Sequence, residues 1–301
     1  MKYIITLMLG CSLMAQQANT TQDSLTVSTV ALSSVTVSAL RANEDTPMAF
    51  TNVSQEELNK QNLGKDLPVL LRFLPNVVTT SDAGAGVGYT GIRVRGSDAT
   101  RVNVTINGIA YNDAESHGTF WVNLSDFASS VEDLQVQRGV GTSTNGAAAF
   151  GASVNVSTDN ASEHAYAQFA SSVGSFNTLK NTIKFSTGIS DSGFEFSGRL
   201  SNITSDGYID RASSNLKGYF LQGTYTSENT KLKALTFGGR ERTYQAWYGI
   251  DANTLATNRT YNPAGAQYDD AGNLQGYYDD QVDNYAQDHT QLHIEQRLSN
   301  S

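Results

Sequence analysis

Few residues of this chain have the types and spacing that catalysis or metal binding requires. The chain contains four histidines, His117, His164, His289 and His293. His289 and His293 would share one face of a strand, but at roughly 3.3 Å per residue they would lie about 13 Å apart, too far to share a metal. Asp113, Glu115 and His117 are close in sequence, yet in a loop they are better explained as solvated side chains. Since no serine or cysteine lies in a nucleophile elbow, the sequence predicts no enzyme active site, no metal site and no cofactor.

Aromatic and arginine side chains gather instead in two segments that we interpret as loops. In the first, Tyr111 to Trp121, the candidate binding residues are Tyr111, Asp113, His117, Phe120 and Trp121. In the second, Arg240 to Gln287, they are Arg240, Arg242 and Trp247. Ring stacking and charge-assisted hydrogen bonds from arginine suit a bulky anionic chelate. Aromatic girdles at a membrane interface would supply the same residues without a binding role, so both interpretations stay open.

Short helices and short strands precede most of these candidates. Ser54 and Glu57 have capping-box spacing, which predicts a helix over Gln55 to Gln61. Asp66 can cap a second helix, with Pro68 in its first turn. A glycine-rich segment from Ser81 to Gly91 is predicted to be a mobile loop.

Four strand patterns surround this loop and follow it. They are Ile92 to Arg95, Val102 to Ile106 before the Asn107-Gly108 turn, Val131 to Gln137, and Val154 to Ser157. Mixed short helices and strands predict a small α+β domain over residues 46–158.

Longer alternating segments occupy residues 163–301. In Thr178 to Ile189 the odd positions are mostly apolar, including Leu179 and Ile183, and the even positions are polar, including Lys180 and Lys184. Gly193 to Ile203 and Asp288 to Leu298 divide in the same way, Leu216 to Tyr225 fits loosely, and Lys231 to Arg240 fits poorly. Segments of about ten residues with one apolar and one polar face are typical of tilted membrane-spanning strands.

A soluble β-sandwich would also have alternating strands, but two features favour a membrane barrel. The segments exceed the usual five or six residues. The connections between them also alternate in length, from the short Ser190 to Ser192 and Ser227 to Asn229 to the long Thr204 to Asn215 and Arg240 to Gln287. Short turns at one rim and long loops at the other are the pattern of outer-membrane barrels.

Composition and charge limit the remaining possibilities. The formal net charge is −9 and no basic cluster is present, which argues against a nucleic-acid partner. Charged residues make up only 16 % of the chain, as expected for strand-rich structure with polar uncharged faces. No apolar stretch of about 18 residues follows the N-terminal region, so no transmembrane helix is predicted.

The N-terminal residues predict that the protein is exported. Lys2 precedes an apolar run that ends near Ala15, so residues 1–15 are predicted to be a secretory signal peptide. Cleavage and lipid attachment at Cys11, the one cysteine, is the alternative. Residues 16–45 lack large apolar residues and are predicted to be flexible, with short β-branched patches at Leu25 to Val30 and Val35 to Val37.

A set of motifs in register now resembles one family, the TonB-dependent outer-membrane receptors. The strongest motif ends the small domain and consists of Arg138 to Gly146, Phe150-Gly151, and Val154 to Thr158. It is similar to the end of the family's plug domain, although Val140 replaces a proline, Asn145 a tyrosine and Ala152 a glycine. Ile92 to Gly96, Asn107-Gly108 and Glu132 also match.

The resemblance implies a fold and the pairing of two charges. The fold is an α+β plug domain followed by antiparallel transmembrane β-barrel strands, of which residues 163–301 would supply the first in an incomplete barrel of a 22-stranded type. Arg95 and Arg138 match arginines that pair with barrel glutamates, which would lie beyond residue 301. Surface charge at strand ends is the alternative for both arginines. In the family, substrate is caught between plug apices and barrel loops, which here correspond to Ser81 to Tyr89 and the two candidate segments above.

The resemblance also implies a function and partners. The expected function is energised uptake of a scarce nutrient, most often a ferric siderophore or other iron chelate, across the outer membrane; cobalamin, haem or a glycan are alternatives. The expected partners are outer-membrane lipid and a TonB-type periplasmic protein that pairs with Val35, Thr36, Val37, Ser38 and Ala39 as an added strand, with Leu25 to Thr29 as a rival segment. A non-energised surface barrel or adhesin would need no such segment.

Overall fold

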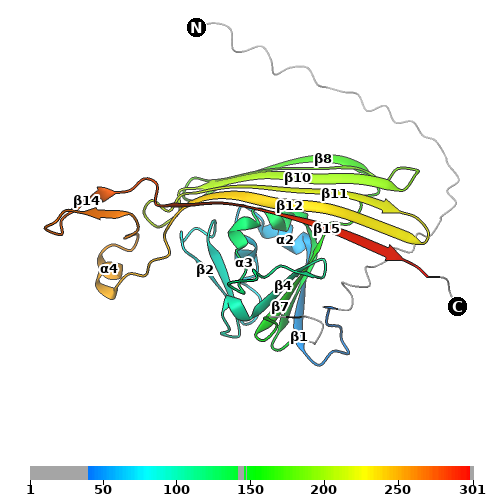
Figure 1. Ribbon diagram of the computed structural model, residues 1–301, viewed down its shortest axis with the longest axis horizontal. Helices are drawn as coiled ribbons and strands as arrows, with labels where there is room; N and C mark the ends of the chain where they lie inside the picture. Colours follow the sequence, from blue (N-terminus) through cyan, green and yellow to red (C-terminus); the bar gives the residue numbers. More distant parts are fainter. Residues whose placement is uncertain (1–39, 142–145, 147, 299–301) are drawn as a thin grey trace, which may run out of the picture. The chain divides into compact units, whose positions relative to one another are not determined.

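Two sheets of different character account for most of the secondary structure (Figure 1). The computed structural model describes residues 40–141, 146 and 148–298. The predicted signal peptide and the Val35 to Ala39 segment lie outside these residues. No helix in the described part of the chain is long and apolar enough to span a membrane.

The first sheet belongs to a small domain and has the order β1-β6-β7-β4-β5. Its strands are β1 (Ala49–Ser54), β4 (Val102–Ile106), β5 (Ile109–Ala110), β6 (Val131–Arg138) and β7 (Ala152–Thr158). A separate hairpin pairs β2 (Val77–Ser81) with β3 (Thr90–Val94). The helices are α2 (Gln55–Gln61) and α3 (Leu67–Leu70), with 3-10 turns η1 (Ala99–Arg101), η2 (Trp121–Asn123) and η3 (Phe127–Ser130).

Local sequence signals account for the start of the small domain. Helix α2 begins with the predicted capping box, in which the Ser54 hydroxyl accepts from the Glu57 N–H and the Glu57 carboxylate accepts from the Ser54 N–H. Helix α3 forms as predicted, but the carboxylate of Asp66 does not cap it. That carboxylate instead accepts a hydrogen bond from the Thr90 hydroxyl at 3.0 Å, because Asp66 is buried beside β3.

The segment predicted to be a mobile loop is held in place. Strand β3 already begins at Thr90, and the preceding residues pack against their surroundings. The Asp66 N–H donates to the Gly86 carbonyl and the Gly86 N–H to the Ser81 hydroxyl, while the Tyr208 N–H donates to the Ala83 carbonyl. We call residues 82–89 the plug loop below.

The second sheet contains six long antiparallel strands in the order β15-β12-β11-β10-β9-β8. They are β8 (Ala165–Gly174), β9 (Thr178–Thr187), β10 (Phe194–Ser205), β11 (Ser214–Thr226), β12 (Thr230–Tyr244) and β15 (Val282–Gln296). The loop predicted over Arg240 to Gln287 is therefore shorter, residues 245–281, because β12 and β15 both continue past those limits. It contains α4 (Ala252–Thr257) and the hairpin of β13 (Ala266–Tyr268) and β14 (Leu274–Tyr277).

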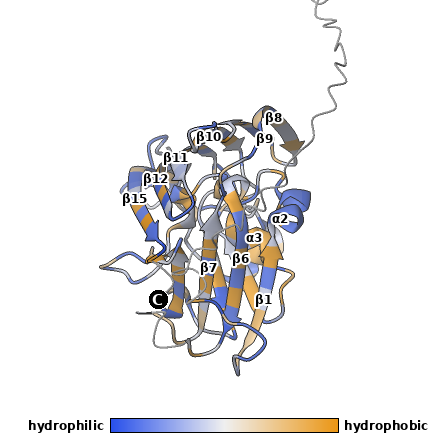
Figure 2. Cartoon of the chain, turned by 90° about the vertical axis from the view of Figure 1, so that its right-hand side faces the viewer, coloured by the Kyte–Doolittle hydropathy of each residue, from blue (hydrophilic) through white to orange (hydrophobic). Residues whose placement is uncertain are grey.

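The long sheet turns its polar face toward the small domain. On β9, Lys180 and Thr182 are buried while Leu179 and Ile183 are exposed. Hydrophilic residues (blue) and hydrophobic residues (orange) alternate along strands such as β12 and β15 in Figure 2. This is the reverse of a soluble protein, in which the apolar face of a strand is buried. The alternation predicted for membrane strands is thus present.

Apolar contacts and glycines join the two parts. Phe127 of η3 packs edge-on against Phe220 of β11 and contacts Phe237 of β12, extending the small domain's core into the sheet. Gly218 and Gly239 face each other across β11 and β12. A Cβ at these two positions would lie 2.5 Å from the Ser125 carbonyl oxygen and 2.8 Å from the Asn123 carbonyl oxygen, respectively, so only glycine lets the small domain approach this closely.

Candidate binding site

One buried carboxylate of the small domain is paired with two cations of the long sheet. Asp126 Oδ1 lies 2.6 Å from Lys180 Nζ, and Arg199 Nη1 lies 3.6 Å from Asp126 Oδ2. The Thr182 hydroxyl also donates to Asp126 at 2.6 Å. Burial raises the pKa of Asp126, but Arg199 and Lys180 outweigh it and hold the pKa below the usual range. This cluster therefore fixes η3 against β9 and β10 by charge.

A second set of contacts joins the small domain and the long sheet with the same arrangement of charges. Lys184 Nζ lies 2.7 Å from Asp159 Oδ2, and Lys233 Nζ donates to the Thr158 hydroxyl at 2.8 Å and to the Asp159 carbonyl at 2.9 Å. In both sets the small domain supplies the acid and the sheet supplies the cations. Sequence reasoning missed these pairs, since each joins residues more than 20 positions apart.

The two arginines singled out by the sequence lie elsewhere, on the small domain. Arg138 donates to the Thr51 hydroxyl at 2.7 Å and to the Phe50 carbonyl at 3.2 Å. Burial and the nearby Arg95 lower the pKa of Arg138. Neither guanidinium forms an ion pair with a carboxylate in the described part of the chain. Their pairing with glutamates beyond residue 301 stays a prediction.

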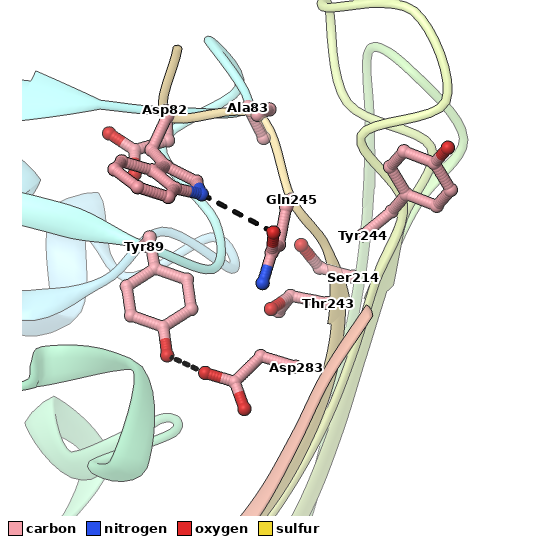
Figure 3. Close-up of a pocket in the computed structure, with 10 residues that line it drawn as sticks. Asp82, Ala83, Tyr89, Ser214, Thr243, Tyr244, Gln245 and Asp283 are labelled. Carbon is pink, nitrogen blue, oxygen red and sulfur yellow. Dashed lines mark hydrogen bonds between the residues drawn. The ribbon is translucent and has the colours of Figure 1, made fainter. Parts of the chain in front are cut away.

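A pocket of about 350 Å³ lies between the plug loop and the ends of β11, β12 and β15 (Figure 3). We call it the plug-loop pocket. Its lining residues are Asp82, Ala83, Tyr89, Ser214, Thr243, Tyr244, Gln245, Ala246, Trp247 and Asp283. Gly88 has φ +91° and a Cβ there would lie 2.6 Å from Ser214 Oγ, so glycine is required where the loop meets the strands.

Tyr89 connects the plug loop to the sheet inside this pocket. Its hydroxyl donates a short hydrogen bond to the Asp283 carboxylate, and Figure 3 shows the two side chains pointing toward each other. Burial and the bond to Asp283 raise the pKa of Tyr89, so the phenol stays protonated at neutral pH. Burial also raises the pKa of Asp82 on the other side of the pocket.

Of the three binding residues predicted in the second segment, only Trp247 lines the plug-loop pocket. Trp247 lines the plug-loop pocket as expected, with its indole N–H donating to Gln245 at 3.4 Å. Arg240 and Arg242 were predicted to bind substrate from a loop, but both belong to β12 and are exposed on the face that also carries Ala234, away from the pocket. Arg242 pairs there with Asp280 at 3.2 Å. Neither arginine therefore lines the plug-loop pocket.

The first-segment residues do not line the plug-loop pocket. Trp121 is 2 % exposed in the core of the small domain, so its indole cannot form a binding surface. Tyr111 packs against the His289 ring at 4.9 Å and donates to Gln287 at 3.2 Å. Asp113 is half-buried and accepts hydrogen bonds from the N–H groups of Glu115 and Ser116 within its own loop, whereas Glu115 and His117 are exposed.

The remaining first-segment candidates stay predictions. His117 and Phe120 are exposed, and His117 adopts φ +58° in the turn that Asp113 closes. Outside the Ser81 to Tyr89 segment, the pocket residues that the sequence analysis did not single out are Ser214, Thr243, Tyr244, Gln245, Ala246 and Asp283. A signal for Thr243 existed, because an alternation extended through Arg240 to Tyr244 would have placed Thr243 opposite the arginines.

Comparison with known proteins settles the nature of the small domain. Residues 42–153 match the family model described as the TonB-dependent receptor plug domain. The chain carries a TonB-dependent receptor plug domain. The family to which this domain model belongs consists of receptors and transporters of the outer membrane, which are not enzymes. No curated protein matches the chain by sequence.

Solved receptors share the fold of the plug domain and the long sheet. The ferric-catecholate import receptor Fiu from E. coli K12 gives a TM-score of 0.62 at 18 % identity over 85 % of this chain and 37 % of that one. P. aeruginosa FpvA bound to heterologous pyoverdines gives 0.61 at 12 % identity, covering 85 % and 32 %. The ferric yersiniabactin uptake receptor FyuA from Yersinia pestis gives 0.57 at 15 %, covering 75 % and 36 %. The chain thus spans about a third of the length of these receptors.

Proposed function

We propose that this chain forms part of an energised outer-membrane importer of a bulky, scarce nutrient, of the class of ferric siderophores and other iron chelates. The observation that carries the proposal is the docking of the plug domain on the polar face of a sheet whose other face is apolar and exposed. Phe169, Ile183 and Leu292 lie on that exposed face and would contact lipid. The charged contacts of Asp126 and Asp159 keep the plug seated.

The plug-loop pocket is where we place the substrate. It lies at the end of the sheet that carries the long connections, residues 206–213 and 245–281, and residues of the plug loop line it. The neighbours named above bind or import ferric chelates, which supports the same class of substrate here. Among the predicted residues, Trp247 is the one that lines the pocket, and His117 and Phe120 are proposed to act from the plug surface.

Energisation is proposed to act through Val35 to Ala39, which precedes the described part of the plug. An extended partner strand would pair with this segment through main-chain hydrogen bonds, and proline removes one donor of such a ladder. In cells that produce the full-length receptor, Val37→Pro should abolish uptake of radiolabelled ferric chelate and leave binding at the cell surface intact.

Thr26→Pro, in the rival segment, is the matched control and should leave uptake unchanged. If uptake is lost in Thr26→Pro alone, the partner protein binds Leu25 to Thr29 and not Val35 to Ala39. Uptake that neither change reduces would contradict energised import and favour a non-energised surface barrel or adhesin.

A further inference from the structure

The plug-loop pocket is acidic. Asp82 comes from the plug loop and Asp283 from the start of β15, and the ten lining residues, all of them described, include no lysine or arginine. This is the opposite of the arginine-rich rim that the sequence predicted for an anionic chelate. The strand register is responsible, since it turns Arg240 and Arg242 outward and Thr243 inward.

A third carboxylate lies behind the pocket, and no donor of ordinary hydrogen-bond geometry reaches it from the described residues. Glu241 is 2 % exposed, and it shares the inward face of β12 with Thr243, which lines the pocket. Neither carboxylate oxygen has a hydrogen-bond partner of ordinary geometry in the described part of the chain, although the hydroxyls of Tyr89 and Thr243 are nearby. Because the single hydroxyl proton of Tyr89 goes to Asp283, it cannot satisfy Glu241 as well. Buried acceptors without donors are costly, so the pocket favours a ligand that brings donors.

Arg211, a cation close to the pocket residue Tyr244, is already committed to other partners. The Arg211 guanidinium stacks over the Tyr277 ring at 3.4 Å and lies 5.6 Å from the Tyr244 ring. It donates to the carbonyls of Asn262 and Ala264 in the long loop. It therefore closes the loop onto the sheet and leaves the carboxylates of the pocket unneutralised.

Aromatic residues also line the pocket. The Trp247 and Tyr248 rings are stacked at 4.6 Å, and both side chains are exposed. Tyr89 and Tyr244 add two further rings to the lining or its edge. Aromatic faces attract ammonium groups, and the attraction adds to that of the carboxylates.

We propose that the plug-loop pocket recognises a protonated amine carried on the outer surface of the imported chelate. The amine would lie between Asp283 and Asp82, with Trp247 covering its methylene groups. This inference rests on the proposed function for the chelate, but the charge preference belongs to the pocket itself. A cationic chelate would be selected and a polyanionic one repelled.

The experiment compares three ferric probes on the purified full-length receptor. They are a linear tris-hydroxamate that ends in a primary amine, the same compound with its amine acetylated, and an anionic tris-catecholate. Isothermal titration should give the amine probe at least tenfold tighter binding than the acetylated probe, and the tris-catecholate the weakest binding. Asp283→Asn keeps an acceptor for Tyr89 while removing the charge, and should reduce the preference to about twofold or less.

Asp288→Asn is the matched control, because Asp288 lies on the same strand but on the opposite face, where it accepts from Tyr219 at 2.7 Å. It should retain the tenfold preference. Equal binding of the first two probes, tightest binding of the tris-catecholate, or no binding of any probe would overturn the inference. Uptake is measured separately in energised cells: a receptor that binds with the amine preference but does not import would overturn the proposed function and leave the inference standing.

Discussion

At the scale of single residues, Asp126 is the side chain on which plug docking depends most. Asp126→Asn keeps the size of the side chain but leaves Lys180 and Arg199 buried without a counter-charge. Removing one partner of a buried pair costs about 3–5 kcal/mol. We expect a lower Tm of the full-length receptor and greater permeability of cells to large antibiotics. Asp98→Asn, at an exposed pair with Arg101, is the control and should change neither measurement.

The same cluster predicts a response to acid. The pKa of Asp126 is lower in the folded protein than its ordinary value of 3.8. A depressed pKa means that the stabilisation is fully present above 3.8 and is lost as the pH falls through the lower, folded value. The Tm of the receptor should therefore fall steeply below pH 3.8. In Asp126→Asn this part of the pH dependence should be missing, and an identical acid profile in both proteins would contradict the assignment.

At the scale of elements, strand β6 holds the chain immediately after the proposed partner segment. The Ala42 N–H donates to Gln135 Oε1 at 2.7 Å, and the Gln135 amide donates back to the Ala42 carbonyl at 2.9 Å. The Gln137 amide donates to the Leu40 carbonyl at 2.8 Å. A pull on residues 35–39 would therefore act directly on β6, an interior strand of the plug sheet.

We call the two hydrogen bonds between the Gln135 side chain and the Ala42 backbone the amide clasp. The variant Gln135→Leu tests it. It removes both bonds to Ala42, so the backbone N–H of Ala42 should exchange with deuterium at least tenfold faster in the full-length receptor. Hydrogen-exchange mass spectrometry of peptides covering residues 40–48 measures the change. Gln168→Leu, at an exposed position of β8, should leave those peptides unaffected, and unchanged exchange in Gln135→Leu would show that the clasp does not hold the segment.

At the scale of the whole molecule, the outward face of the long sheet controls solubility. Phe169, Val173, Leu200, Leu292 and Ile294 are all exposed on it. Such a face is an aggregation hazard in water. The protein should sediment as aggregate in buffer and run as a single species in mild detergent. A monodisperse protein without detergent would contradict the lipid-facing assignment of this surface.

Much of the secondary structure follows from local sequence. The capping box at Ser54 and Glu57 forms α2 over the predicted residues because its hydrogen bonds span only three positions. The two-residue alternation from Thr178 onward likewise gives β9 and its two faces, because a strand turns each successive side chain to the opposite side. Motifs in register, above all Arg138 to Thr158, were enough to identify the plug domain.

What only the tertiary structure decided is which distant residues meet. The sequence offered Trp121 and Trp247 as equal candidates, yet packing buries the first in the core and leaves the second beside the plug-loop pocket. Arg240 and Arg242 do not line the pocket, because β12 extends to Tyr244 and its register turns both side chains outward. The pairs Asp126 with Lys180 and Tyr89 with Asp283 join residues 54 and 194 positions apart. No local pattern encodes such a pair, because it exists only where the plug is seated against the sheet.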